Sequence, residues 1–447
     1  MNNLITLQDL IIVPLTLLVA YFIGNRVKNK YIKEFPYYKY FVWGLWAKIF
    51  AGLAFAAVYL YYYGGGDTVY YFWGSQSIFN MLGKDIPTFF KLLFGNHSAE
   101  VYSMFDYNTG YPLYFRDPNS FSVSRFNLPF YLLGLGSYLG NTVIMNLILY
   151  LGVWQFYKMV VKLYPANEKG LAIALFFVPS VVFWSSGILK DGWTLTAILV
   201  MFANFYHIFI LKEKVVKNIL WLFVWSYIAF SIRPYIFYVA LGSGLIWVGF
   251  SAIKSIQSTF LRTIAFPFII LLVWVTGATI IAQTGTVAGQ RYSSVDAMLE
   301  TAQIIQDDLR KDYYGGNSFD IGAFEPTFSG VLSKAPQAIV AGTFRPFLWE
   351  GNGVLMLLAG FENMALLLLV FYLLVKMRIF RFFTSLGKDP FLLALFVLAI
   401  TFAFTVGLTT ANFGALVRYN IPVKVSLVLV LFELNRQVSR IKSTKKV

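Results

Sequence analysis

The amino-acid sequence predicts an all-α, polytopic membrane protein with about 11 transmembrane helices and two long outer loops carrying amphipathic helices. Of the 447 residues, 58% are hydrophobic and only 13% are charged, whereas soluble domains usually carry about 25% charged residues. The mean hydropathy is +0.66. Several apolar runs reach about 20 residues, the length that a helix needs to cross the hydrocarbon core. Polar surface is therefore too scarce for a water-soluble globule.

The predicted spans are apolar segments bounded by polar or basic residues. They lie near residues 10–25, 40–62, 140–161, 170–188, 192–211, 217–232, 235–251, 264–283, 353–375, 390–409 and 421–434. The first lacks a preceding positive region, so we expect a permanent span and not a cleavable signal. The number of spans depends most on two places: the short pair of spans joined at "SIRPY", and the apolar stretch 128–139. One span fewer or one more there would reverse part of the predicted topology. We expect residues 1–447 to form one transmembrane domain.

Basic residues gather in the segments on one side of these spans. They are "NRVKNKYIKEF", "LKEKVVKN", "VKMRIFRFFTSLGKD" and "NRQVSRIKSTKKV", with the loops 162–169 and 252–263. The positive-inside rule makes this side cytoplasmic, which places the C-terminus inside and the N-terminus in the periplasm. The short basic loops favour a bacterial inner membrane. The net charge of +15 thus reflects topology, and we expect membrane lipids and no nucleic acid as partners.

The chain has no cysteine and only two histidines, His97 and His207. Disulfides and thiolate metal sites are therefore excluded, and a histidine-rich metal or haem site is not expected. A divalent cation held by acidic residues stays open as a cofactor.

Two long segments, 63–139 and 284–352, are predicted to form a periplasmic cap. Both contain amphipathic pieces, "IPTFFKLLFG" and "VLSKAPQAIVAGTF", which we expect to lie along the membrane surface. Apolar residues at helical spacing predict one further outer helix over residues 294–312.

Charged residues near the outer span ends stand in short motifs and are the candidate functional residues. They are Asp67 in "GGGDT", Arg116, Asp117 and Arg125 in "YFRDPNSFSVSRFN", Lys190 and Asp191 in "FWSSGILKDGW", Arg233 in "SIRPY", Arg345 and Glu350 in "TFRPFLWEGN", and Asn412 and Arg418 in "TTANFGALVRYN". Charged groups at membrane depth usually face a protein interior or a wet cavity, so we expect one outward-opening pocket. Arginine binds phosphate with its planar fork, and an acid among basic groups acts as a general base or binds a divalent cation.

Each motif also has a purely structural interpretation. Arginines at span ends often reach lipid headgroups, and Lys190 with Asp191 fits an ion pair at a tight turn. Glu350 fits an interfacial anchor, and Asp67 a loop acid or a helix cap. Within the spans, Lys48 and Glu362 are the charged residues singled out.

The motif order resembles bacterial envelope-glycan proteins. An outer-loop acid after an early span, "PSVVFWSSGILKDG", "FRPFLWE" after a long outer loop, and "NFGALVRYNIP" before the last span are similar to C-type integral-membrane glycosyltransferases and the related O-antigen or exopolysaccharide polymerases. The resemblance covers most of the chain through short, degenerate motifs.

The resemblance implies a sugar donor linked to polyprenyl phosphate or diphosphate, and transfer on the outer face to a glycan or other envelope acceptor. Asp67 matches the catalytic base of the transferases, and Arg233, Arg345 and Arg418 match the arginines that hold the lipid diphosphate in the polymerases. Asp191 and Glu350 are the other candidate catalytic acids. The candidate substrate-binding residues are Arg116, Arg125, Lys190, Arg233, Arg345, Asn412 and Arg418. The sequence departs from the transferases because Asp67 follows the second span and lacks a paired acid, which favours a polymerase-like protein.

Two other classes stay open. A transporter or flippase of lipid-linked glycans is expected to have ionisable residues at mid-membrane and broken helices in paired positions, and no internal repeat is evident. A non-catalytic subunit of an envelope complex would dock its protein partners through residues 284–352.

Overall fold

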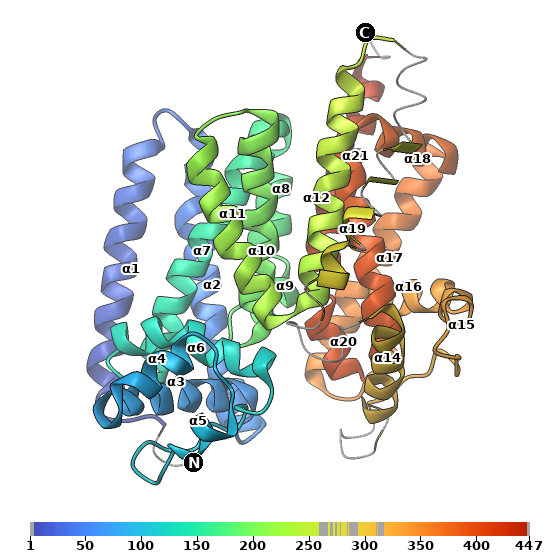
Figure 1. Cartoon of the computed structure of the whole chain (residues 1–447). Coiled ribbons are helices and arrows are strands. Elements are labelled where there is room, and N and C mark those ends of the chain that lie inside the picture. The colour runs from blue at the N-terminus through green and yellow to red at the C-terminus, as the bar shows by residue number, and fades with distance from the viewer. Residues whose placement is uncertain are drawn as a thin grey trace. The chain divides into compact units, whose positions relative to one another are not determined.

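The computed structural model describes residues 4–258, 294–309, 311 and 317–444, with short stretches between 267 and 285. In this part of the chain every regular element is a helix, and the only β-type pairing is an antiparallel bridge between Ser318 and Asn412 (Figure 1). The chain divides into two compact units. The first contains Met1–Lys158, Leu175–Val200 and Val224–Arg233, and the second contains Met159–Ala174, Met201–Phe223 and Pro234–Val447.

Eight helical segments of the described chain are long and apolar enough to cross a membrane, which confirms an all-α, multi-pass membrane protein. They are α1 (Asp9–Tyr31), the segment Pro36–Tyr62 with α2 (Lys39–Ala57) and the π-helix η2 (Val58–Tyr62), α7 (Tyr138–Leu163), the segment Lys190–Ile210 with α10 (Lys190–Phe205), α11 (Val215–Ile232), α12 (Pro234–Ser255), α17 (Val354–Met377) and α19 (Pro390–Thr409). A ninth is α20 (Phe413–Tyr419) with α21 (Ile421–Thr444), if this pair, bent by 53°, counts as one span. The predicted number of 11 is not confirmed.

The predicted span 170–188 is broken in the structure. Helix α8 (Glu168–Phe176) ends before Phe177, and α9 (Pro179–Trp184) begins at a proline. Proline has no N–H to donate and disfavours a helical conformation in the residue before it. Val178 is accordingly extended, with φ −71° and ψ 115°. The predicted span 264–283 lies mostly outside the described residues.

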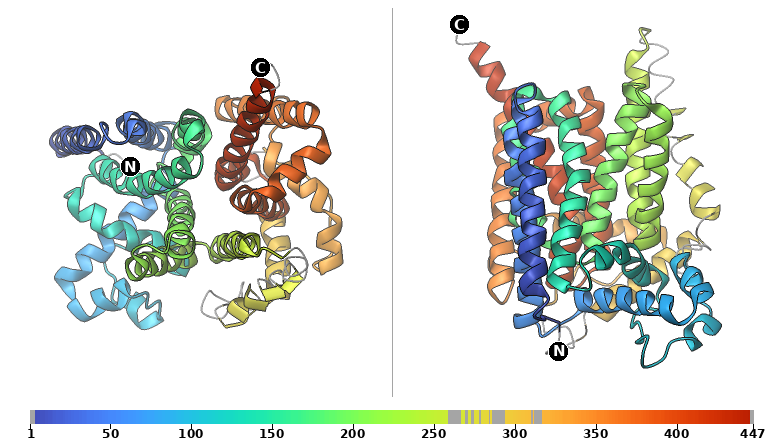
Figure 2. Two further views of the ribbon diagram at one scale, coloured as in Figure 1. Left: turned by 90° about the horizontal axis from the view of Figure 1, so that it is seen from above. Right: turned by 90° about the vertical axis from the view of Figure 1, so that its left-hand side faces the viewer.

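The segment between η2 and α7, which was predicted to be the first outer loop, folds into four helices. They are α3 (Asp67–Lys84), α4 (Ile86–Leu93), α5 (Ala99–Ser103) and α6 (Pro118–Leu133). Asp85 and Asp117 cap α4 and α6, since their side chains accept hydrogen bonds from the backbone N–H groups of Thr88 and Asn119. Within the first unit, α3 lies across the direction of α1 (Figure 2). The apolar stretch 128–139 forms the end of α6, a turn and the first residues of α7.

The segment predicted to be the second outer loop contains the predicted helix, α14 (Val295–Leu309), followed by α15 (Phe328–Ser333) and α16 (Ala335–Phe344). The backbones of α16 and α19 touch. A Cβ atom added to Gly342 would lie 2.0 Å from the Ala403 carbonyl oxygen, and one added to Gly407 would lie 1.9 Å from that of Ala338. One face of α16 is thus buried against a span, which differs from the expected surface helix.

An aromatic core fixes α2 against α7 in the first unit. The Trp154 ring centroid lies 4.8 Å from that of Phe41 and 4.9 Å from that of Tyr157. The Tyr150 hydroxyl donates a hydrogen bond to the Phe41 carbonyl oxygen (2.7 Å). These contacts give the Tyr150 hydroxyl a partner and pack α2 against α7.

Candidate functional site

The first unit contains a buried ion pair at the start of α10. Asp191 lies in the first turn of that helix, and Arg233 directly follows α11. Arg233 Nη1 lies 2.8 Å from Asp191 Oδ1, and the two side chains are 8% and 1% exposed. Because charges are rarely buried unless paired, the pair gives each group a partner and fixes its position.

Lys190 connects this pair to two further acids. Its Nζ lies 3.7 Å from Asp117 Oδ2. It also interacts electrostatically with Asp67, Asp191 and Arg233. These five residues, Asp67, Asp117, Lys190, Asp191 and Arg233, are called the charged cluster below. They come from the starts of α3 and α10, the cap of α6 and the end of α11, so four separate parts of this unit contribute to one cluster.

Asp67 is the first residue of α3 and stands behind a glycine hinge. Gly64, Gly65 and Gly66 have φ values of 68°, 122° and 125°, a region that other residues adopt only with strain. The Tyr114 hydroxyl donates a hydrogen bond to Asp67 Oδ1 (2.5 Å). The cap position itself is Gly66, so the hinge and Tyr114 orient Asp67, which remains partly exposed.

The surroundings of Asp117 favour its carboxylate form. Burial raises its pKa, but Lys190 and hydrogen bonds from Ser120 and Asn119 outweigh that effect, so the pKa lies below its ordinary value of 3.8. Asp117 thereby gives the Lys190 ammonium group a negatively charged neighbour at 3.7 Å.

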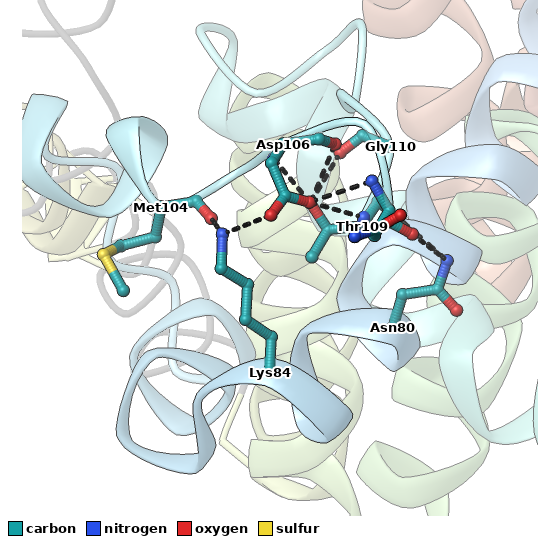
Figure 3. Close-up of polar contacts among 7 residues, drawn as sticks. Asn80, Lys84, Met104, Asp106, Thr109 and Gly110 are labelled. Atoms are coloured by element: carbon teal, nitrogen blue, oxygen red, sulfur yellow. Dashed lines mark hydrogen bonds and ion pairs between the residues drawn. The ribbon is translucent and has the colours of Figure 1, made fainter.

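The loop that carries Tyr114 and Asp117 is fastened to the end of α3. Lys84 Nζ lies 2.7 Å from Asp106 Oδ2 and also donates to the Met104 carbonyl oxygen, while Asp106 Oδ1 accepts from the backbone N–H of Thr109 (Figure 3). Asn80 donates more weakly to the Thr109 carbonyl oxygen (3.4 Å). The hydrogen bond from Lys84, with help from that of Thr109, lowers the pKa of Asp106 from 3.8 to about 2.

Two basic candidates of the same region are not part of the charged cluster. Arg125 is buried and donates to the Leu93 carbonyl oxygen, Ser122 Oγ and the Tyr227 hydroxyl. It therefore ties α6 to the end of α4 and to α11. Burial and the positive charge of Arg125 lower the pKa of His97. Arg116 is exposed.

In the second unit, Arg345 and Glu350 bind each other through two parallel contacts. Arg345 Nε lies 3.0 Å from Glu350 Oε2, and Nη2 lies 2.6 Å from Oε1. The guanidinium lies 4.7 Å from the Phe319 ring centroid and 5.5 Å from that of Phe413. Glu350 thus occupies the fork that was predicted to bind phosphate, and an anion would have to displace it.

The other two candidates of the second unit belong to α20. Asn412 caps this helix by accepting hydrogen bonds from the backbone N–H groups of Gly414 and Ala415. Arg418 lies in its last turn, with its guanidinium 5.9 Å from the Tyr419 ring centroid. Asn412 therefore has a structural role in the local fold.

The sequence interpretation missed one charged partner inside the spans. Lys424 Nζ lies 2.8 Å from Glu362 Oε1, and the Lys424 side chain is 1% exposed. The available signal was a lysine inside the predicted span 421–434. Lys48 is also buried and donates to the carbonyl oxygen and the hydroxyl of Ser185.

The candidate residues fall into separate groups in the two units, each described here by itself. Among the described residues, no group of three or more His, Cys, Asp or Glu side chains is arranged to hold a metal ion.

Comparisons with known proteins found no match, so a functional proposal is based on the geometry of the charged cluster. No family model matches the sequence, and neither the curated proteins nor the solved structures include a match. The resemblance to envelope-glycan enzymes accordingly stays a prediction.

Proposed function

We propose that the protein is an outer-face glycosyltransferase or glycan polymerase that uses a polyprenyl-phosphate- or polyprenyl-diphosphate-linked sugar. The observation that carries the proposal is the charged cluster, in which acids and bases from separate turns meet beside a glycine hinge. This combination supplies both groups that glycosyl transfer requires, a cation for the leaving phosphate and a carboxylate for the acceptor.

In the proposed reaction, the acceptor hydroxyl oxygen forms a bond to the anomeric carbon while the bond from that carbon to the phosphate oxygen breaks. The phosphate leaves with the electron pair, and Lys190 and Arg233 stabilise its charge. Asp67 accepts the hydroxyl proton as general base, held in orientation by Tyr114. Asp191 keeps the Arg233 guanidinium in place.

The test uses the purified full-length chain in proteoliposomes with a photoreactive polyprenyl phosphate and, separately, a labelled polyprenyl-diphosphate oligosaccharide. Lys190→Met is expected to reduce photo-crosslinking by about tenfold or more, because a charge-assisted contact contributes roughly 1.5–3 kcal/mol. Asp67→Asn is expected to keep crosslinking and to lose turnover by a factor of about 10²–10⁴, as for a general base. Assays with Mg²⁺ and with EDTA are included, since the cluster has more acids than bases.

The matched control is Lys30→Met, which removes an exposed lysine from the end of α1. This variant should change neither the photo-crosslinking nor the turnover. Equal crosslinking of the original chain, Lys190→Met and a chain with both Lys190 and Arg233 replaced by Met would rule out a phosphate site at the cluster.

A transporter or flippase is the second candidate, because the predicted span 170–188 is interrupted between α8 and α9 and the pair α20–α21 is bent, both near buried charges. A small cavity at the α8–α9 break is lined by Leu175, Phe176 and Lys48, and the bent pair α20–α21 contains Lys424. Discontinuous helices of this kind often bind substrates at mid-membrane. Movement of a fluorescent polyprenyl phosphate between leaflets of the same proteoliposomes, without sugar transfer, would favour this class over the enzyme.

A further inference from the structure

Four residues of the second span form a stripe along one face. Lys48, Gly52 and Phe55 belong to α2, and Tyr59 belongs to the π-helix that continues it. Their spacing of four, three and four residues places them one above another on a helix. This α2 stripe contacts two segments that are distant in sequence.

The first contact is made by Lys48 at the end of α9. Lys48 is 5% exposed, and its Nζ donates to the Ser185 carbonyl oxygen (2.9 Å) and to Ser185 Oγ (3.1 Å). The loop after α9 interrupts the helical hydrogen-bond pattern within an apolar interior. A carbonyl group in that position is costly unless a donor reaches it, and Lys48 is that donor.

The next two residues of the loop follow the stripe. The Ser186 carbonyl oxygen accepts a hydrogen bond from Asn146 Nδ2 (2.7 Å) and would lie 3.0 Å from a Cβ atom added to Gly52. A Cβ atom added to Gly187 would lie 2.3 Å from the Phe55 ring. Ser185, Ser186 and Gly187 therefore run along α2 in close contact, and three residues later the chain reaches Lys190 and Asp191.

The far end of the stripe supports the hinge before Asp67. The Phe55 and Tyr59 rings are stacked at 4.5 Å. Tyr59 accepts a hydrogen bond at its carbonyl oxygen from the N–H of Gly65 (2.7 Å), and its ring would lie 3.2 Å from a Cβ atom added to Gly66. One helix face thus supports the segments leading to Asp67 and to the Lys190–Asp191 turn.

We propose that Lys48 is a positioning residue, which sets the location of Lys190 and Asp191 through the Ser185 carbonyl group. The α2 stripe then holds these two residues and Asp67 in one fixed arrangement. The positional role stands on geometry alone, and its effect on turnover rests on the proposed function.

Because the chain has no cysteine, a single introduced cysteine is its only thiol and can report on its own surroundings. A Ser186→Cys substitution introduces a reporter in the loop, and Ser124→Cys on α6 introduces a matched reporter elsewhere in the unit; the two serines are 0% and 1% exposed. Labelling by a small charged thiol reagent is measured in native membranes. With Lys48→Met, labelling at position 186 is expected to accelerate by about tenfold or more, because an unsatisfied buried carbonyl costs roughly 1–3 kcal/mol.

Labelling at position 124 should stay unchanged, and Lys48→Arg, which keeps a cationic donor, should preserve slow labelling at position 186. A parallel increase at both positions would show general loosening and overturn the proposal, as would no increase at either. If Lys48→Met does not fold, Gly187→Ala is the second variant, since it leaves Lys48 in place but pushes the loop from Phe55. It should also accelerate labelling at position 186, and unchanged labelling would overturn the proposal.

The crosslinking assay separates this inference from the proposed function. Faster labelling at position 186 in Lys48→Met, combined with no polyprenyl-phosphate crosslinking in the original chain, would uphold the positioning role and reject the transferase.

Discussion

At the scale of single residues, the notable feature of this protein is its buried, paired charges. Asp191 with Arg233, and Glu362 with Lys424, are ion pairs in which at least one side chain is nearly inaccessible. Removing a charge from water is costly, and the attraction between partners offsets that cost only when the geometry is good. Such pairs fix positions within the fold more than they stabilise it.

Glu362→Gln is predicted to destabilise the second unit by about 3 kcal/mol, because it removes the carboxylate from a buried ammonium group. Thermal unfolding in detergent would measure the change. The double variant Glu362→Leu with Lys424→Met should recover most of it, since an apolar pair replaces a buried ion pair with little loss. Equal losses in the single and double variants would contradict a role for the charge itself.

Acid is predicted to loosen the loop that contains Asp106. The folded pKa of about 2 lies below the ordinary value of 3.8, so the stabilising contribution is complete above pH 3.8 and is lost as the pH falls towards 2. Hydrogen exchange of residues 104–110, corrected for the intrinsic pH dependence, measures this loss. Lys84→Met should move the loss to higher pH, and Asp106→Asn should abolish its pH dependence; a profile unaffected by either change would exclude this ion pair as the cause.

The candidate site was partly predictable from sequence. Motif position named Asp67, Asp117, Lys190, Asp191 and Arg233 among a larger set of candidates that was expected to share one pocket, and the structure places these five near one another. The sequence did not reveal that Arg125 ties helices together, or that Glu350 accepts the hydrogen bonds of the Arg345 guanidinium. Both features depend on side-chain contacts that a sequence pattern does not identify. Tyr114 was missed for the same reason, since tyrosine is common in this chain and only its contact with Asp67 distinguishes it.

At the scale of helices, apolar length predicted most of the spans that the structure contains. The helices α1, α7, α17 and α19 lie where hydropathy placed them. The segment 170–188 failed because hydropathy is insensitive to the missing N–H of Pro179, which breaks the helix. The burial of α16 against α19 also escaped prediction, since it depends on glycines whose meaning appears only when two helices are paired.

Gly407→Ala is predicted to destabilise the second unit by about 1–3 kcal/mol, the usual effect of overpacking, because the new Cβ would lie 1.9 Å from the Ala338 carbonyl oxygen. Gly387→Ala on α18 (Ile379–Lys388) is the matched control, since a Cβ there has no described neighbour within 4 Å. That change should be neutral or stabilising by up to about 1 kcal/mol, because alanine favours helix over glycine. Similar unfolding temperatures for the two variants would argue against close α16–α19 contact in the membrane.

At the scale of the whole molecule, composition predicted a helical membrane protein and the structure confirms that class. Orientation was predicted from loop charge alone. A single cysteine at Tyr107, which is 96% exposed, is predicted to react with a membrane-impermeant reagent from the periplasmic side. A cysteine at the exposed Glu213 should react only after the membrane is opened. The reverse pattern would exclude an outer-face reaction at the charged cluster.

The touching backbones of α16 and α19 have a consequence for natural variation in this protein. Two helices that meet through glycine and carbonyl groups leave no room for a larger residue at Gly342 or Gly407, and neither helix rotates or slides without separating from the other. Related chains should therefore keep the length of 335–344 and small residues at both glycines. A deletion designed within the second predicted outer loop should end before Asn317, because Ser318 pairs with Asn412 and the Phe319 ring centroid lies 4.7 Å from the Arg345 guanidinium.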